Sequence, residues 1–168
     1  MPKNSDSKLS ALEQYKVAID TRNLEIGLFW QRSNYFLVLN AALALGFFKV
    51  EEGKFSVLLA VFGIFVSIIW FRVNLGSKFW QSRWEQRLKL KEEEIASDLN
   101  YYSADWDLIY KDVKDNLEYS SKNNGWVRRW IDRETLNKPS VSYNMILLSI
   151  IFQIGWILLV VLEFITSS

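Results

Sequence analysis

The amino-acid sequence predicts an all-α integral membrane protein with three transmembrane helices and a small helical cytoplasmic domain between the second and the third. Half of the 168 residues are apolar and 23% are charged, yet three stretches are almost free of charge: residues 35–48, 55–70 and 141–162. A helix needs about 20 apolar residues to cross the hydrocarbon core of a bilayer. No other part of the chain is large enough to cover such helices if they were the buried hairpin of a soluble protein.

The first 28 residues (1–28) are polar and predict a cytoplasmic N-terminal helix. They lack the apolar segment and the cleavage site of a secretory signal peptide. A transmembrane hairpin is expected to follow over residues 29–75, with a short external turn at residues 49–54. Its first span, YFLVLNAALALGFFKV, is 16 residues long and therefore short. It reaches full length if the same helix contains the residues just before it: Phe29, Trp30 and Arg32.

Two further spans are predicted, Phe55 to Leu75 and Val141 to Phe164. Basic residues give the orientation: five precede the first span, two lie in the turn after it, thirteen lie between Arg72 and Lys138, and none follows the third span. Because basic flanks stay in the cytoplasm, the N-terminus and the helical region of residues 76–139 are expected inside. The third transmembrane segment, residues 140–168, then has an external C-terminus.

The stretch SKFWQSRWEQRLKL, directly after the second span, is interpreted as a joint at the membrane surface. The span is expected to continue as a helix through Gly76 to about Ser97. At helical spacing the tryptophans of this joint lie along one side, and its arginines form a neighbouring basic row. Such a helix either projects as a stalk or lies along the inner leaflet. The joint residues are Trp80, Trp84, Arg83 and Arg87.

Two shorter helices are expected before the third span. A cap at Ser103 should start the first of them, and the segment SSKNNG should end it. The stretch GWVRRWIDRE then predicts a short interfacial helix that carries Trp126 and Trp130. Ser140 or Ser142 should cap the third span. For most of the aromatic residues in this region, helix–helix packing in a small bundle is the expected role, with the membrane surface as the alternative.

Basic and aromatic residues in the joint also allow a nucleic-acid interpretation, with arginine on phosphates and tryptophan on bases. The acidic run Glu92 to Glu94 and a net charge of only +1 oppose it, because nucleic-acid-binding domains are usually strongly basic. No nucleic-acid partner is therefore expected.

Small residues form a continuous seam along one face of the second span. In lipid, such a seam lets another helix approach closely. That helix is either the first span of the same chain, through Ala42 and Gly46, or a span of another subunit. The seam consists of Ser56, Ala60, Gly63 and Ser67.

Two amides, Asn40 in the first span and Gln153 in the third, are expected at membrane depth. Each would cost on the order of a few kcal/mol if it faced lipid, so both should face protein. Three spans offer few inward positions, and the partners of these amides are therefore expected on another copy of the chain. The sequence thus predicts a homo-oligomer.

The sequence shows no apparatus for catalysis and no site for a metal ion or a cofactor. It contains no His and no Cys, and so lacks an imidazole base and a thiol nucleophile. Its seven glycines form no phosphate-binding loop. An enzyme is therefore not expected. The polar residues of the spans do not align into a stripe, so a permanently open selective channel is not expected either.

Three stretches resemble the RipA family of octameric membrane proteins, which are small proteins of the bacterial inner membrane. They are the junction NLGSKFWQSRWEQRLKLKEE, the lead KPSVSYNMILLSI into the third span, and the first part YKVAIDTRNLEIGLFWQRSNYFLVLNAALAL. The resemblance covers most of the chain. It implies a location in the bacterial inner membrane, a homo-oligomer, roles in stress or host survival, and no catalytic residues.

The preferred functional hypothesis is a non-enzymatic, homo-oligomeric inner-membrane protein. Its cytoplasmic helices would sense or bind a partner, and its assembly would perturb or permeabilise the membrane, by analogy with pore-forming effectors of stress response or phage defence. The alternative is a static scaffold or accessory subunit that recruits a cytoplasmic protein. The expected partners are the lipid bilayer, further copies of the chain and a cytoplasmic protein.

Overall fold

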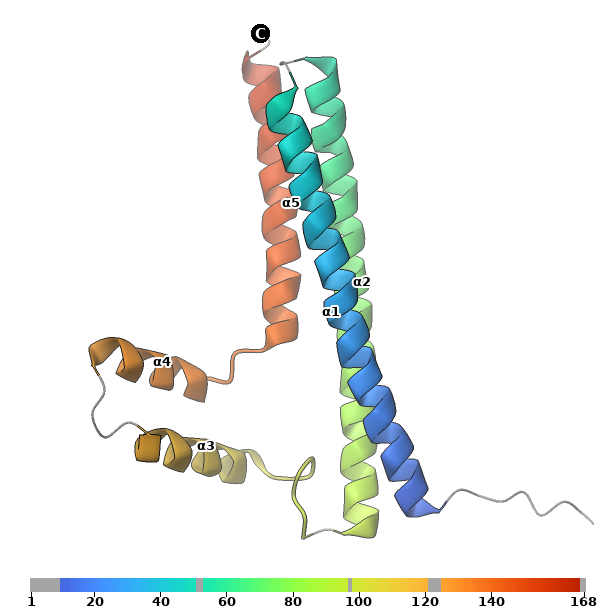
Figure 1. Cartoon of the computed structure of the whole chain (residues 1–168), viewed down its shortest axis with the longest axis vertical. Coiled ribbons are helices and arrows are strands. Elements are labelled where there is room, and N and C mark those ends of the chain that lie inside the picture. Colours follow the sequence, from blue (N-terminus) through green and yellow to red (C-terminus); the bar gives the residue numbers. More distant parts are fainter. Residues whose placement is uncertain (1–9, 51–52, 97, 121–124, 167–168) are drawn as a thin grey trace, which may run out of the picture. The chain divides into compact units, whose positions relative to one another are not determined.

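A computed structural model describes residues 10–50, 53–96, 98–120 and 125–166 of the chain. These residues form five helices and no strand, which confirms the all-α prediction (Figure 1). The helix of the second span continues through Gly76, as predicted, and ends at Ile95. The five helices are α1 (Ala11–Lys49), α2 (Lys54–Ile95), α3 (Trp106–Ser120), α4 (Trp126–Leu136) and α5 (Val141–Thr166).

Local hydrogen bonds fix the starts of the two long helices. At the start of α1, Ser10 Oγ accepts a bond from the backbone N–H of Glu13 at 3.3 Å, and the backbone N–H of Ser10 donates to Glu13 Oε2 at 2.8 Å. This reciprocal pair is a capping box. Gly53 precedes α2 with a φ of +152°, which side-chain-bearing residues rarely adopt. The backbone N–H of Gly53 donates to Ser56 Oγ at 3.1 Å.

The start of α5 confirms one of the two predicted caps. The backbone N–H of Asn144 donates to the carbonyl oxygen of Ser140 at 3.0 Å. The backbone N–H of Tyr143 donates to Ser140 Oγ at 3.4 Å. Ser140 is therefore the cap. The predicted turn SSKNNG contains residues 121–124, which lie outside the described residues, and α3 ends at Ser120.

The start of α3 corrects another prediction, because Ser103 does not cap it. α3 begins only at Trp106, and the backbone N–H of Ile109 donates to the carbonyl oxygen of Asp105 at 3.1 Å. The backbone N–H of Ser103 instead donates to Glu92 Oε2 at 2.8 Å. A carboxylate from the end of α2 therefore holds this segment in a bent loop.

The chain divides into two compact units. Unit 1 contains Met1–Leu24 and Gln81–Pro139, and unit 2 contains Glu25–Trp80 and Ser140–Ser168. α1 and α2 each contribute one part to each unit. The domain boundaries predicted from the sequence refer to the membrane surface, and they stay predictions.

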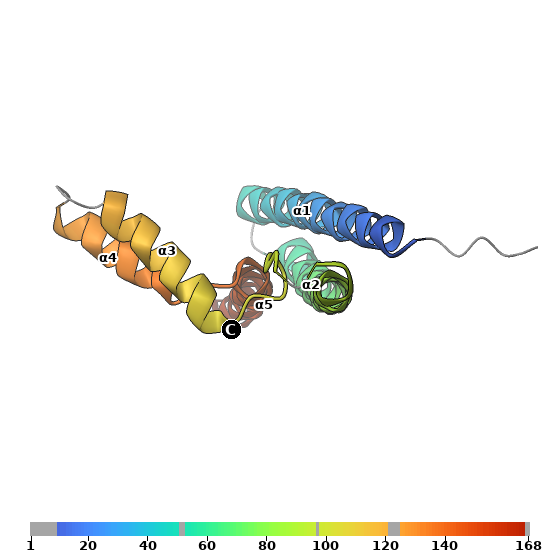
Figure 2. The ribbon, with the colours of Figure 1, turned by 90° about the horizontal axis from the view of Figure 1, so that it is seen from below.

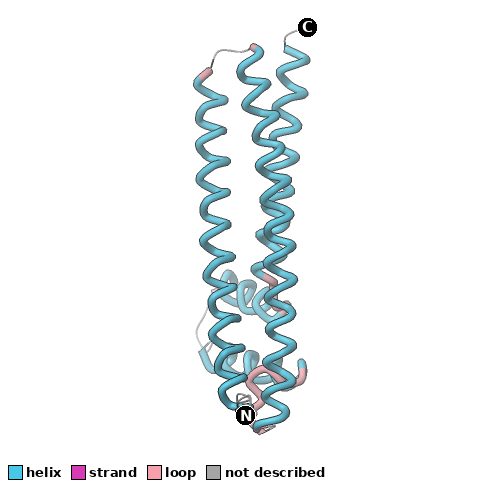
Figure 3. Tube along the Cα trace, turned by 90° about the vertical axis from the view of Figure 1, so that its right-hand side faces the viewer, coloured by secondary structure: helices cyan, strands magenta, loops and turns pink. Residues whose placement is uncertain are grey.

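Unit 2 buries small and polar side chains together with a few large apolar ones such as Trp70 and Trp156, and it exposes most of its large apolar side chains. Its parts of α1, α2 and α5 lie side by side (Figures 1, 2 and 3). Asn40, Ser67 and Ser149 are completely buried. So many exposed apolar side chains over buried polar ones depart from the pattern of a water-soluble protein and suit a protein surrounded by lipid. Exposed apolar side chains of the three helices include Val38, Leu45, Phe62, Phe65, Leu158 and Ile165.

Two helices of the described chain, α2 and α5, are long and apolar enough to cross a membrane. Only 33% of the apolar window of α2 and 22% of that of α5 is buried inside the protein, whereas the core helix of a soluble protein is mostly buried. α1 does not meet the same criterion, because Asn34 and Asn40 interrupt its apolar stretch and Arg32 and Lys49 bound it. Length and composition therefore support two of the three predicted spans.

In unit 1, Glu92 anchors the loop that follows α2. Its carboxylate is 1% exposed and accepts hydrogen bonds from the backbone N–H groups of residues 101–103 at 2.6 to 2.8 Å. Arg22 of α1 forms an ion pair with Glu85 of α2 at 3.8 Å, and its guanidinium lies 5.6 Å from the ring centre of Tyr102. The start of α1, the end of α2 and this loop are thus joined.

Candidate functional site

The interior of unit 2 is organised around the amide of Asn40. Its Oδ1 accepts hydrogen bonds from Trp156 Nε1 at 2.9 Å and from Ser67 Oγ at 3.2 Å. Its Nδ2 donates to the carbonyl oxygen of Phe36 at 2.9 Å, one turn earlier in α1. One buried side chain of α1 therefore connects α2 and α5. In an apolar surrounding such polar groups are costly unless they are paired.

Gly63 of α2 provides the space for the indole of Trp156. A Cβ atom on Gly63 would lie 2.3 Å from Trp156 Cδ2, which is far inside van der Waals contact. Trp156 also packs with Phe47 of α1 and Ala60 of α2 in the buried apolar cluster of the unit. The Phe47 and Trp156 ring centres are 6.2 Å apart in an edge-to-face arrangement. The small residue at position 63 is therefore required by the chain itself.

All four seam residues are buried within one chain. The seam packs against α5 as well as α1, whereas only α1 was expected from the same chain. Ser56, Ala60 and Ser67 are at most 1% exposed. Ala42, the expected counterpart in the first span, is exposed, and Gly46 is half-buried. Of the two alternatives for the seam, the described contacts support packing within the chain. The side chain that packs against the seam is Trp156 of α5, where Ala42 of the first span was expected.

The two amides differ in their surroundings. Asn40 has its partners on its own chain, in contrast to the expectation that another copy would supply them. Gln153 is half-buried in α5, and no hydrogen bond joins its side chain to another described residue. Gln153 therefore stays a candidate for a contact with another copy.

The polar face of α2 is longer than the sequence analysis recognised. Asn74 Nδ2 donates to the carbonyl oxygen of Met145 in α5 at 3.1 Å. Ser77 Oγ accepts a hydrogen bond from Arg32 of α1 at 3.4 Å. Asn74 and Ser77 lie seven and ten residues after Ser67, so they continue the seam at helical spacing. Extending the seam past the apolar stretch would have found both residues in the sequence.

We expect Asn40→Leu to lower the free energy of unfolding of the protein in detergent by about 1–2 kcal/mol. The substitution leaves Trp156 Nε1 and Ser67 Oγ without their acceptor in an apolar interior. Unfolding by sodium dodecyl sulfate in mixed micelles measures the change. Asn34→Leu is the matched control, because Asn34 lies on the exposed side of α1. Equal effects of the two substitutions would contradict the assigned role of Asn40.

Most residues predicted to form the membrane-surface joint are exposed. Trp80 is exposed in unit 2, and Trp84 is half-buried in unit 1. Neither α4 tryptophan packs inside the chain, since Trp126 is 76% and Trp130 58% exposed. Within the described part of one chain these two residues therefore lie outside the packed interior, and their interfacial role stays a prediction. Arg83 and Arg87 are exposed as well.

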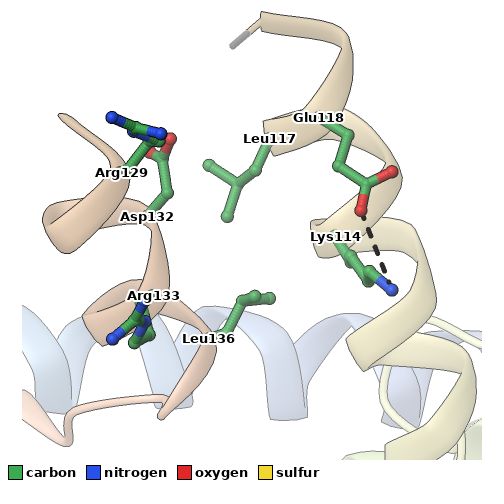
Figure 4. A pocket seen from close by; sticks show the side chains of 7 residues that line it. All are labelled: Lys114, Leu117, Glu118, Arg129, Asp132, Arg133 and Leu136. Carbon is green, nitrogen blue, oxygen red and sulfur yellow. Dashed lines mark ion pairs between the residues drawn. The ribbon is translucent and has the colours of Figure 1, made fainter. Parts of the chain in front are cut away.

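A shallow groove lies between α3 and α4, which run side by side in unit 1 (Figure 4). Its volume is about 260 Å³. Lys114 and Glu118 of α3 form an ion pair at 3.7 Å, and Asp132 of α4 pairs with Arg128 at 3.3 Å. Sequence reasoning did not single out this groove, because neither helix shows it without the other. Its charges are arranged as ordinary surface pairs.

The carboxylates of the described chain do not assemble into a metal site. No group of three acidic side chains in residues 10–50, 53–96, 98–120 and 125–166 is close enough to hold a metal ion. Glu92 accepts hydrogen bonds from three backbone N–H groups of its own loop. Its geometry is that of a structural anchor.

Comparison with known sequences supports the membrane assignment. The model of the octameric membrane protein family (8xMP) matches residues 12–165. Neither a curated protein nor a solved structure matches the chain. The matched range covers all five helices almost completely, and the family description agrees with a membrane protein that associates with copies of itself. The chain therefore belongs to the octameric membrane protein family.

Proposed function

We propose that the protein is a non-enzymatic, homo-oligomeric scaffold of the bacterial inner membrane, with three spans, a cytoplasmic N-terminus and an external C-terminus. The observation that carries this proposal is the surface of unit 2, where most large apolar side chains are exposed while the amide of Asn40 is bonded inside. A self-associating membrane protein needs such an apolar surface both for lipid and for its neighbours. Family membership supports the oligomer.

Packing supports α1 as the third span, although its composition alone does not. Asn40 is the main polar interruption of its apolar stretch, and the amide is bonded to Ser67 and Trp156. These partners lie inside the two helices that are apolar enough to cross a membrane. On its other side α1 exposes Val38 and Leu45. With the amide of Asn40 satisfied, the exposed surface of α1 over residues 36–48 is apolar and suits lipid.

The described contacts favour the scaffold over a permeabilising effector. A pore needs polar groups that are free to line a water-filled path. Asn40, Ser67 and Asn74 instead use their polar atoms inside one chain. Apart from Gln153 of α5, a second copy would therefore meet a mainly apolar surface at these depths, which supports association without a conducting path.

The exposed surface of helix α4 indicates that unit 1 contacts something other than its own chain. None of its residues is buried in the described chain, and Trp126 and Trp130 follow each other by one turn. A short helix that combines exposed tryptophan with arginine suits the headgroup layer of a bilayer. We propose that α4 rests on the inner leaflet and presents the α3–α4 groove to a recruited cytoplasmic protein.

Two measurements on the purified protein test the scaffold. In mild detergent we expect one particle several times heavier than the 19.8 kDa chain. In liposomes loaded with a self-quenched dye, we expect no release, either alone or after addition of cytosolic extract. A monomer would refute the oligomer. Dye release with the extract would replace the scaffold by the permeabilising effector, and a heat-treated extract is the control.

A further inference from the structure

A cavity of about 310 Å³ lies between the ends of α1 and α5 in unit 2. Its walls are mainly apolar and include Phe47 and Phe48 of α1 and Leu159 of α5. One carboxylate, that of Glu163, also lines it. The cavity shares Phe47 with the apolar cluster around Trp156 but is separate from the Asn40 network and from the α3–α4 groove. Its volume is at the lower end of the range of small-molecule sites.

Glu163 is buried without a partner for one of its oxygens. The residue is 8% exposed, and its Oε2 is buried and accepts no hydrogen bond in the described chain. The nearest hydroxyl of the cavity wall does not serve it, because Thr166 Oγ1 donates to the carbonyl oxygens of Leu162 and Glu163 at 3.1 and 3.2 Å. Among the described residues, no lysine or arginine forms an ion pair with Glu163.

A carboxylate in this position is unfavourable unless something compensates it. A buried carboxylate oxygen without a hydrogen-bond donor is costly, and ionisable residues within membrane helices are rare and mark functional sites. Neither the packing of unit 2 nor the scaffold function uses this group. A positively charged partner that compensates the carboxylate of Glu163 must therefore come from outside the described residues.

We propose that this cavity binds an organic cation, with its ammonium group on the Glu163 carboxylate and its apolar body against the surrounding walls. The Phe47 and Phe48 ring centres are 5.3 Å apart in an edge-to-face arrangement, and aromatic faces attract organic cations. The apolar walls suit a hydrocarbon body. A bare Ca²⁺ or Mg²⁺ ion would need about six oxygen ligands, and the wall offers one carboxylate, so the chemistry favours an organic ammonium.

Such an ammonium has two possible sources, the headgroup of a phosphatidylethanolamine and a free lipophilic cation. The first arm of the test uses benzyltrimethylammonium and isothermal titration calorimetry on the intact oligomer in dodecyl maltoside. We expect saturable binding that Glu163→Gln weakens at least 10-fold. Glu118→Gln makes the same change of charge at an exposed carboxylate in unit 1 and should leave the affinity unchanged.

The second arm uses native mass spectrometry with added phosphatidylethanolamine or phosphatidylglycerol. Retention of phosphatidylethanolamine by the wild type, and its loss in Glu163→Gln, would identify the lipid as the source. Binding of benzyltrimethylammonium without such a preference would identify a free cation. If Glu163→Gln retains both ligands as well as the wild type does, or if the wild type retains neither, the cation site is refuted.

A measurement on the unsubstituted protein covers the case in which Glu163→Gln does not fold. Dicyclohexylcarbodiimide, an apolar reagent for buried carboxyl groups, should modify Glu163, and benzyltrimethylammonium should slow this reaction several-fold. An unchanged rate refutes the cation site. If Glu163→Gln instead dissociates the oligomer and no cation binds, the partner is a lysine of a neighbouring copy. That result would overturn the cation site and leave the homo-oligomer intact.

Discussion

Gly63→Leu is expected to lower the free energy of unfolding of the protein in detergent by about 3 kcal/mol, at the upper end of the usual cost of overpacking. Any side chain at position 63 meets the Trp156 indole, since even a Cβ would lie 2.3 Å from it. The indole cannot move outwards without breaking its hydrogen bond to Asn40. Unfolding by sodium dodecyl sulfate in mixed micelles measures the loss.

Gly155→Leu in α5 is the matched control, because no atom lies within 4 Å of the Cβ position there. We expect it to have a much smaller effect. The particle mass separates the two interpretations of the seam. If Gly63→Leu divides the oligomer but leaves the unfolding of each chain unchanged, the seam packs between subunits and the assigned contact with Trp156 is wrong.

Glu92→Ala is expected to release the loop of residues 101–103 and to destabilise unit 1 by about 1–3 kcal/mol. Three backbone N–H groups lose their common acceptor, which no neighbouring side chain replaces in the same geometry. Hydrogen exchange of these amides should accelerate strongly. Glu93→Ala is the control, since Glu93 is exposed and adjacent in sequence. Equal exchange in the two variants would show that Glu92 is not the anchor.

The same carboxylate should make the stability of unit 1 depend on pH. Burial raises the pKa of Glu92, but the hydrogen bonds from the backbone N–H groups of residues 101–103 outweigh it and hold the pKa below its ordinary value of 4.5. Since protonation is harder in the folded state, the stabilisation is complete above pH 4.5 and is lost as the pH falls through the folded pKa. Thermal unfolding of the wild type and Glu92→Gln should therefore converge as the solution is acidified below pH 4.5.

Much of the helical framework could be predicted from the sequence because its causes are local. The apolar stretches of α2 and α5, the continuation of α2 through Gly76 and the cap at Ser140 each depend on residues within a few turns of one another. Helix periodicity and capping act over that distance. The family resemblance could also be seen in the sequence, because its motifs are short continuous stretches directly beside the spans.

The sequence predicted less well wherever a residue's role depends on a distant partner. Ser103 resembles a helix cap in the sequence, but α3 begins only at Trp106, and Ser103 belongs to the loop that is bonded to Glu92. Glu92 itself looked like one member of a solvated acidic run. The α3–α4 groove forms only when the two helices pack against each other. Hydropathy alone does not identify α1 as a span, because it treats the side chain of Asn40 as an unpaired polar group.

The sequence by itself determined that the chain is helical, that two of its helices are apolar enough to cross a membrane, and that it belongs with the octameric membrane proteins. Only the tertiary structure decided that Asn40 bonds to Trp156, 116 residues away, that Gly63 makes room for the same indole, and that Glu163 faces a cavity without a partner. Hydropathy and helical period describe each segment separately. The free energy of a buried polar or small residue depends on which segment lies against it, and that is settled only when the helices pack.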